Sequence, residues 1–439
     1  MTTRVAPRLT ALLMLLITAA CAPAHTTAPP PPAPAPAPAA PAPTPLPPLP
    51  AMGGDAAFQA FVRDFEATAL AEGITPETYN RAMAGVAPIA TIQQAIDNQP
   101  EFARQIWSYL DSAVSARRVA NAKVMLTRYA DTLAAIESKT GVPSEILVAI
   151  WGMETDYGSS AGDYNLFATL TTQAYQGPRQ QYAQRELLAA LKLLQQENYP
   201  VSEMTASWAG AFGQTQFMPS TFFKYATDGD GDGKIDLWNS APDALASTAE
   251  MFVHEGWQTG KRWGYEVKLP KNFDYSLADL DERRALSDWA AMGIETADGA
   301  ALPNDNSLGD SDPASLYLPA GARGPAFMLF NNFRVIMQYN NAASYALATG
   351  MLADRMAGGK VFVASWPRGE RALSLAERSQ FQTDLKTLGY DPGDTDGVLG
   401  RKSRAALKQY QKSKNLPADG FPTAALLVSL DSDAQSAAR

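Results

Sequence analysis

The sequence predicts a mainly α-helical protein with a small β portion, followed by a separate small helical module. Three observations lead to this prediction. Apolar side chains recur at helical spacing along most of residues 51–365, and strand-like patterns are confined to about 260–320. From about residue 366 onward, short helical patterns alternate with turn-rich connections. The 439 residues leave room for two or three domains.

The amino-acid composition argues against several classes of function. The net charge of −9 and the pI near 5.0 argue against a nucleic-acid partner, which needs a basic face. Cys21 is the one cysteine, so no internal disulfide can form, and the two histidines, His25 and His254, are far apart in sequence. These counts argue against a zinc site and against Ser-His-Asp or Cys-His catalysis. Catalysis would then rest on carboxylates, backbone groups and neutral polar side chains.

The first 21 residues read as a targeting segment. Arg4 and Arg8 precede an apolar run, residues 9–20, that is too short for a bilayer span and typical of a secretory signal. The run ends in Ile-Thr-Ala-Ala-Cys, which resembles a bacterial lipobox and implies a lipid anchor on Cys21. Ala22, rather than aspartate, implies sorting to the outer membrane. The alternative is an ordinary signal peptide followed by an incidental cysteine.

Residues 22–50 are an Ala/Pro-rich linker. Such a composition cannot build a core and favours extended polyproline II. We expect a tether that holds the following domain away from a membrane.

The main body, residues 51–365, begins with two helices. Phe58, Phe61, Val62 and Phe65 recur at helical spacing, and Thr75-Pro76 reads as an N-cap with a first-turn proline. Further helical patterns are expected at 101–113, 114–139, 143–156, 179–197, 219–227, 241–256 and 327–356. The best strand patterns run from Gly264 to Leu269 and from Ser315 to Leu318.

The segment 143–156 carries a candidate acid. Helical steps back from Glu154 reach Trp151, Ile150, Leu147 and Ile146, so the carboxylate ends an apolar stripe. Desolvation there should raise the pKa of Glu154, as a general acid requires. The alternatives are a buried glutamate held by a partner and a boundary residue turned to water.

A second cluster, residues 207–220, combines small residues with neutral polar ones. Gly210 and Gly213 permit close backbone approach, while Ser207, Gln214 and Gln216 offer groups suited to sugar hydroxyls and amides. A tight turn between helices is the competing interpretation.

The third cluster has the spacing of an EF-hand calcium loop. Asp228, Asp230 and Asp232 occupy positions 1, 3 and 5, glycine follows at 6, and Lys234 offers its carbonyl at 7. Asn239 replaces the usual glutamate at position 12, so Asp243 would have to bind from a lengthened loop. We expect a structural calcium ion here and no cofactor for catalysis. A plain acidic surface turn is the alternative.

Residues 366–439 form the C-terminal module. Phe381, Leu385 and Leu388 share one helical face, a second helix carries Leu407 and Tyr410, and a third is expected from Thr423 to Leu430. The Asp-Gly-Val-Leu-Gly and Leu-Pro-Ala-Asp-Gly elements resemble the three-helix peptidoglycan-binding domain of wall hydrolases. Its core is small, so we expect a targeting role. A metal site at Asp394 and Asp396 is disfavoured because the loop lacks further ligands.

With these stretches in place, residues 55–355 resemble the lytic murein transglycosylase B family, which has a lysozyme-like fold. The resemblance rests on Gly-Met-Glu-Thr-Asp-Tyr-Gly at 152–158, on the cluster at 207–220, on the acidic loop and on Tyr339-Asn340 with Tyr345. It implies that Glu154 is the acid/base and that the cleft residues are Ser207, Gln216, Tyr182, Tyr339 and Tyr345. Met251 stands where the family often has a cleft tyrosine. The implied calcium ligands are Asp228, Asp230, Asp232, the Lys234 carbonyl and Asp243.

The resemblance also implies the reaction. Glu154 alone would cleave the N-acetylmuramic acid–N-acetylglucosamine bond of peptidoglycan and leave 1,6-anhydro ends. Asp156 is poorly placed as a second carboxylate, because i and i+2 point to different helix faces. The expected location is periplasmic and lipid-anchored, with peptidoglycan strands as the partner and wall-synthesis enzymes as further candidate partners. Two alternatives stay open at this point: a lysozyme-type hydrolase and a non-catalytic peptidoglycan-binding lipoprotein.

Overall fold

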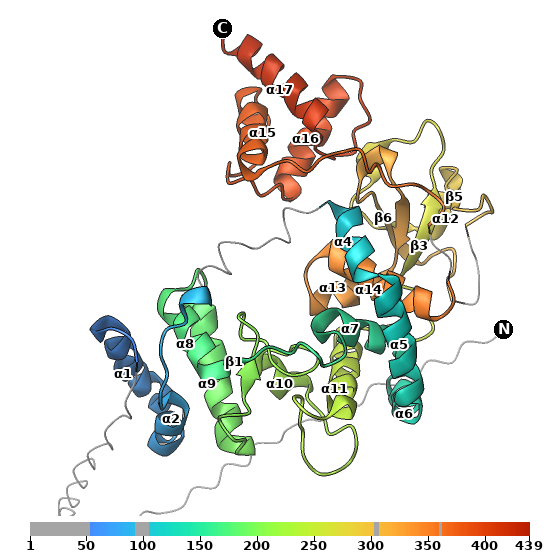
Figure 1. The fold of residues 1–439 in the computed structure, drawn as a ribbon. Coiled ribbons are helices and arrows are strands. Elements are labelled where there is room, and N and C mark those ends of the chain that lie inside the picture. Colours follow the sequence, from blue (N-terminus) through green and yellow to red (C-terminus); the bar gives the residue numbers. More distant parts are fainter. Residues whose placement is uncertain (1–52, 93–104, 303–306, 360–361) are drawn as a thin grey trace, which may run out of the picture. The chain divides into compact units, whose positions relative to one another are not determined.

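The computed structural model describes residues 53–92, 105–302, 307–359 and 362–439 (Figure 1). The predicted signal peptide, lipidation at Cys21 and Ala/Pro-rich linker lie outside these residues. Within them, the prediction of a mainly helical chain with a small β portion is confirmed. No helix in the described ranges is long and apolar enough to cross a membrane.

The body opens with two capped helices, α1 (Ala56–Ala71) and α2 (Pro76–Met83). The Asp55 side chain accepts a hydrogen bond from the Phe58 amide at 2.8 Å, and the Thr75 hydroxyl accepts one from the Thr78 amide. These side chains satisfy amides that the helix itself cannot pair. The next helices are α4 (Ile106–Ala113), α5 (Ala116–Arg128), α6 (Ala130–Thr140) and α7 (Ser144–Thr155).

Helix α8 (Leu166–Gln176) was not predicted from the sequence. Eight of its eleven residues, three of them threonines, are buried on several faces, so it has no one-sided apolar stripe. It packs as a hairpin against α9 (Gln180–Glu197), which was predicted. The acidic loop then lies between α10 (Pro219–Tyr225) and α11 (Ala241–His254).

The β portion is a five-stranded sheet with strand order β4-β6-β7-β3-β5. Its strands pair antiparallel, with Tyr265 opposite Met328 and Leu316 opposite Met328 on the two sides of β7. The strands are β3 (Gly264–Lys268), β4 (Arg284–Ala285), β5 (Glu295–Thr296), β6 (Pro313–Tyr317) and β7 (Ala326–Leu329), with α12 (Leu286–Ala291) between β4 and β5. A short ladder, β1 (Tyr164–Asn165) with β2 (Thr205–Ala206), lies elsewhere.

The predicted helical stretch 327–356 is partly wrong. Its first residues form strand β7, and the rest divides into α13 (Asn331–Tyr339) and α14 (Ala343–Met356). All four residues of β7 are buried, and a short fully apolar run does not distinguish a buried strand from a helix. Helix α14 packs along α7 at the centre of the main core (Figure 1).

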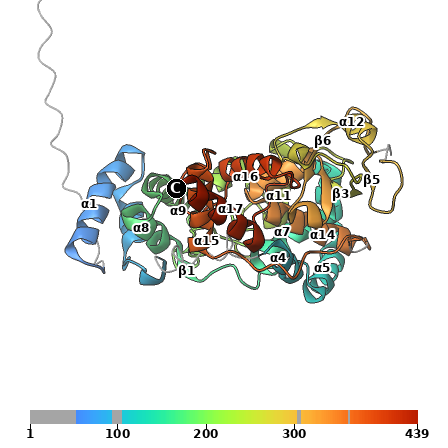
Figure 2. The same cartoon turned by 90° about the horizontal axis from the view of Figure 1, so that it is seen from above.

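The C-terminal module consists of three helices, as predicted: α15 (Leu375–Thr387), α16 (Arg401–Ser413) and α17 (Ala424–Ala437). They lie together in both views (Figures 1 and 2). Phe381, Leu385, Leu407 and Tyr410 fill the small core between them. A capping box between Ser374 and Glu377 starts α15.

Candidate active site

Glu154 lies half-buried in the last turn of α7. Directly after it the helix ends in three residues of positive φ: Asp156 at 49°, Tyr157 at 64° and Gly158 at 82°. The turn folds the Tyr157 ring back onto the helix, and a Cβ on Gly152 would lie 2.6 Å from the Tyr157 hydroxyl oxygen. The Tyr157 hydroxyl donates to the Arg118 carbonyl. The chain therefore reverses immediately beyond the candidate acid.

Tyr345 contacts this carboxylate from α14. Its side chain is buried, and its hydroxyl donates a hydrogen bond to Glu154 Oε1 at 2.5 Å. Burial, and after it the charge of Glu154, raises the pKa of Tyr345 far above its usual range. The phenol therefore stays protonated at any physiological pH and acts on Glu154 as a donor.

Tyr339, at the end of α13, approaches from a second side. Its hydroxyl donates to the Thr215 carbonyl, and its ring packs against Phe217 and Phe252 with centroids 6.3 and 5.9 Å away. Burial raises the pKa of Tyr339 well above its usual range, and the charge of Glu154 adds to the rise. The structure thus gathers Glu154, Tyr339 and Tyr345 in one place.

The 207–220 cluster is tied to the end of α7. The Thr155 hydroxyl donates to the Gln214 carbonyl at 2.6 Å and accepts from the Gly158 amide at 2.9 Å. Gln216 has a positive φ of 53°, and its amide donates to the Ala161 carbonyl at 2.9 Å. These hydrogen bonds hold the 207–220 cluster against the end of α7 and the segment that follows it.

Two predicted cleft residues differ in placement. Ser207 is half-buried beside the same turn: its hydroxyl donates to the Ala211 carbonyl at 3.2 Å, and a Cβ on Gly162 would lie 2.6 Å from the Ser207 nitrogen. Tyr182 lies on α9 with 39 % of its surface exposed. Burial of its hydroxyl and the neighbouring Glu186 raise the pKa of Tyr182 to about 12. The charged groups that act on Tyr182 are Glu186, Arg179 and Arg185.

Sequence reasoning missed Thr155, which connects the two motifs, and Thr215, whose carbonyl accepts from the Tyr339 hydroxyl. Thr155 is buried and lies inside the 152–158 motif, and Thr215 is buried inside the second cluster. The position of Thr155 directly after the candidate acid is the sequence signal that could have identified it. Tyr109 of α4, which lies near enough to Tyr345 to affect its pKa, was also missed. No sequence signal points to Tyr109.

The acidic loop brings three carboxylates together. Oxygen atoms of Asp228, Asp230 and Asp232 all lie within 4.8 Å of one another. Backbone amides of Gly233 and Gly231 donate to Asp228 and hold the pKa of that carboxyl below its usual range, the Gly233 bond contributing most. An oxygen-rich loop of this kind matches what calcium prefers.

Asp243, the proposed fifth ligand, lies apart from that group of three. It is buried at the start of α11, and its two carboxylate oxygens accept hydrogen bonds from the Gly229 and Asp236 amides at 2.8 and 2.7 Å. Burial raises the pKa of Asp243. Its ligand role, and that of the Lys234 carbonyl, stay predictions.

The site thus consists of one half-buried acid at a helix end, in a helical body that is joined to a three-helix module. Two protein families match the chain: the transglycosylase SLT domain over residues 57–354 and the putative peptidoglycan binding domain over residues 374–430. The chain therefore belongs to the SLT transglycosylases. Within them it belongs to the lytic murein transglycosylase B family, enzymes that act on peptidoglycan, as the sequence predicted.

Three similar proteins support this family assignment. The membrane-bound lytic murein transglycosylase B of Escherichia coli K12 is 29% identical over 329 residues, which are 71% of this chain and 86% of that protein. SltB3 of Pseudomonas aeruginosa, solved with NAG-anhNAM-pentapeptide, is 46% identical with a TM-score of 0.83, covering 86% of this chain and 100% of SltB3. Escherichia coli Slt35, solved with calcium, is 28% identical with a TM-score of 0.59 over 70% of this chain and 95% of Slt35.

Proposed function

We propose that this lytic transglycosylase cleaves the β-1,4 bond between N-acetylmuramic acid and N-acetylglucosamine with Glu154 as its single acid/base. The hydrogen bond from the buried Tyr345 hydroxyl to Glu154 Oε1 carries the proposal, because it orients the carboxyl group. Asp156 is engaged elsewhere, with its Oδ2 3.0 Å from Arg117 Nη1. Asp156 therefore does not act as a second catalytic carboxylate in this mechanism.

The proton balance closes on Glu154. The protonated carboxyl gives its proton to the glycosidic oxygen as the bond to muramic C1 breaks. The carboxylate then takes the proton of the muramic C6 hydroxyl, whose oxygen attacks C1 and closes a 1,6-anhydro ring. Glu154 ends protonated, and no water is consumed. The ligand of SltB3, NAG-anhNAM-pentapeptide, contains such a group, which supports the same product here.

The polar residues around Glu154 would line the glycan cleft. Ser207, Gln216 and Tyr339 belong to the segments that meet at Glu154, and Tyr182 would contact a sugar farther along the strand. Ser207, Gln216 and Tyr339 donate to backbone carbonyls, so a bound glycan would compete for these donors.

Mass spectrometry of muropeptides released from purified peptidoglycan tests the proposal. The wild type should release fragments one water lighter than hydrolysis products, and Glu154→Gln should release none. Glu197→Gln, an exposed acid at the end of α9, is the matched control and should behave as wild type. Fragments of normal hydrolytic mass from the wild type would instead mean a lysozyme-type hydrolase.

We also propose a calcium ion at Asp228, Asp230 and Asp232, supported by their mutual oxygen distances and by the calcium complex of the relative Slt35. A cation would relieve the repulsion between three close carboxylates. A chelator should then lower the Tm by several degrees, and calcium should restore it. Asp230→Asn should weaken the response, whereas an unchanged Tm with and without chelator would contradict the site.

Anchoring through Cys21 is a further proposal, supported by the lipobox-like sequence and by the Escherichia coli relative, which is membrane-bound. Cys21→Ala should move the protein from the membrane fraction to the periplasmic fraction. Retention of the variant in membranes would contradict it.

A further inference from the structure

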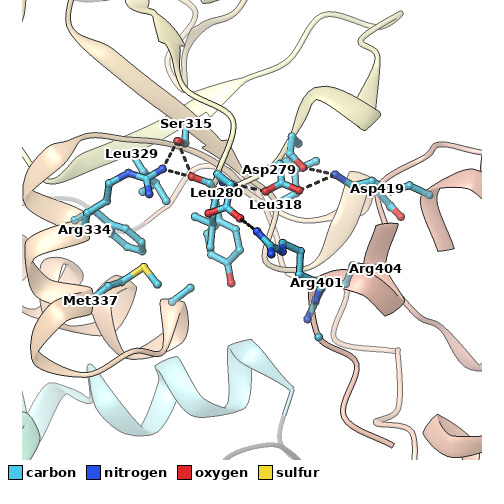
Figure 3. Close-up of a pocket in the computed structure, with 17 residues that line it drawn as sticks. Asp279, Leu280, Ser315, Leu318, Leu329, Arg334, Met337, Arg401, Arg404 and Asp419 are labelled. Carbon is cyan, nitrogen blue, oxygen red and sulfur yellow. Dashed lines mark hydrogen bonds and ion pairs between the residues drawn. The ribbon is translucent and has the colours of Figure 1, made fainter. Parts of the chain in front are cut away.

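Two cavities lie between the body and the C-terminal module. One, of about 330 Å³, lies between the segment 278–281 and α16 (Figure 3). The other, of about 380 Å³, lies between α4, the start of α14 and the loop 397–400. Tyr317, Ala343, Gly400 and Arg404 line both, so the two form one inter-module cleft.

The cleft reaches the neighbourhood of the proposed acid. Ser344 and Tyr109 line the second cavity. Ser344 directly precedes Tyr345, which donates to Glu154, and Tyr109 lies near enough to Tyr345 to affect its pKa. A chain bound at Glu154 therefore lies beside the mouth of this cleft.

The second cavity is positively charged although the chain as a whole is acidic. Its lining includes Arg378 and Arg404 and no carboxylate. The Arg378 guanidinium donates to the Gly397 and Leu373 carbonyls at 2.7 and 2.9 Å, and it forms no ion pair with any residue that the structure describes. In a protein of net charge −9, an acid-free cavity with two arginines favours an anionic ligand.

In the first cavity most charges are already matched. Arg401 Nη1 lies 3.0 Å from Asp281 Oδ2, and Lys408 Nζ lies 3.7 Å from Asp279 Oδ2. Arg334 donates to the Leu280 carbonyl and to Ser315 Oγ (Figure 3). These contacts hold the wall of the cleft rather than offering free donors.

Arg404 and Tyr317 are different. Within the described part of the chain, the Arg404 guanidinium and the Tyr317 hydroxyl make no hydrogen bond and no ion pair with another residue. Burial raises the pKa of Tyr317 and the charge of Arg404 opposes the rise, so the two groups lie near each other. Both are donors that face the shared part of the cleft.

We propose that Arg404, with the Tyr317 hydroxyl, binds a carboxylate of the peptide stem that a glycan strand carries, while the strand lies at Glu154. This rests on the proposed function. An arginine and a phenol together suit a carboxylate, since both donate and the guanidinium carries the charge. The module would then be part of the substrate site and not solely a wall-targeting element.

The test measures binding in the full chain carrying Glu154→Gln, which prevents turnover. The ligands are a NAG-NAM tetrasaccharide with peptide stems and the same tetrasaccharide after stem removal by an amidase. The Glu154→Gln protein with Arg404 intact should bind the stem-bearing ligand more tightly than the ligand without stems. Arg404→Gln should reduce that preference by roughly 10-fold or more, the usual size of one charge-assisted hydrogen bond.

Two further variants sharpen the result. Lys402→Gln removes an exposed positive charge from the same helix outside both cavities, and it should keep the preference. Tyr317→Phe removes only the hydroxyl and should reduce the preference by a smaller factor. Equal binding of both ligands before substitution, or equal effects of Arg404→Gln and Lys402→Gln, would overturn the proposal. Release of anhydro products by the wild type is scored separately, so failure of the proposed function is distinguishable.

Discussion

Tyr345 is the residue whose chemistry is best defined by its surroundings. It is buried, protonated and bonded to Glu154, although the two residues are 191 positions apart in sequence. A donor in this position orients the carboxyl group and stabilises its charged form.

Tyr345→Phe should therefore lower kcat by roughly 10- to 100-fold, the cost of one hydrogen bond to a charged group. KM should change little, because the ring keeps its packing. Steady-state release of soluble muropeptides measures both constants. Tyr390→Phe, which removes a hydroxyl bonded to Ser413 in the module, is the control. A loss confined to KM would mean that Tyr345 binds substrate and does not position Glu154.

A second residue-scale feature is the half-buried carboxyl group of Asp354 on α14. Burial raises the pKa of Asp354 to about 6, and the Trp263 indole, which donates to it at 3.3 Å, opposes the rise. Between pH 4, which is near the pKa of an unfolded aspartate, and pH 6, the folded state binds the proton of Asp354 more tightly than the unfolded state does. The free energy of unfolding should therefore fall as pH rises from about 4 to about 6.

Asp354→Asn should remove that part of the pH dependence and raise the free energy of unfolding at pH 7 by on the order of 1–2 kcal/mol, since the neutral amide still accepts from Trp263. Denaturant titrations at pH 4.5 and 7 measure it. Asp64→Asn, at an exposed position of α1, should alter neither value. The assignment is wrong if both variants behave alike.

At the scale of elements, the decisive contact is between the end of α7 and the 207–220 cluster. Thr155 provides it with one hydroxyl that both donates and accepts inside the core. Removing that hydroxyl leaves the Gln214 carbonyl and the Gly158 amide without their partner.

Thr155→Val keeps the shape of the side chain and should lower the free energy of unfolding by about 1–3 kcal/mol, with a loss of kcat as Glu154 loses its fixed turn. Thermal unfolding and muropeptide release report the two effects. Thr127→Val on exposed α5, whose hydroxyl bonds only to its own helix, is the matched control. A variant as stable as the control would show that this docking contact is dispensable.

Elements with a one-sided apolar stripe or a marked start were predictable, including α7, although eight of its twelve residues are buried. Helices α7, α9 and α11 were expected near their observed bounds because each shows a stripe or a clear start. Helix α8 and strand β7 were missed because burial removes the polar positions that mark a period. Glu154 was predictable from its motif, whereas its contact with Tyr345, 191 positions away, depends on tertiary packing.

At the scale of the whole molecule, residues 363–368 of the segment between body and module are bonded to the body. Arg368 forms a two-fold ion pair with Asp111 of α4, at 2.6 and 2.9 Å. Glu266 of β3 accepts hydrogen bonds from the Val363 and Ala364 amides. The module adds its own contacts, among them Lys408 Nζ donating to the Ala278 carbonyl at 2.6 Å.

Lys408→Met should weaken the attachment of the module by about 1–2 kcal/mol, the cost of the ammonium's hydrogen bonds to backbone carbonyls. Limited proteolysis between residues 357 and 373 should become faster, and the radius of gyration from small-angle scattering should increase. Lys386→Met, an exposed lysine on α15, is the control. Unchanged cleavage in Lys408→Met would mean that the ion pairs of the connecting segment suffice.

The contacts of Asp419 show that the module is not an interchangeable part. Its carboxylate accepts from the Ala322 amide in the body and, within the module, from Gln411 and Phe421. A foreign module of the same family, fused after residue 373, would keep this bond only if it placed its own acceptor beside the Ala322 amide. A functional chimera would need the module and the body residues that contact it to match each other. Recombination between such genes therefore has fewer permissible crossover points than their domain boundaries suggest.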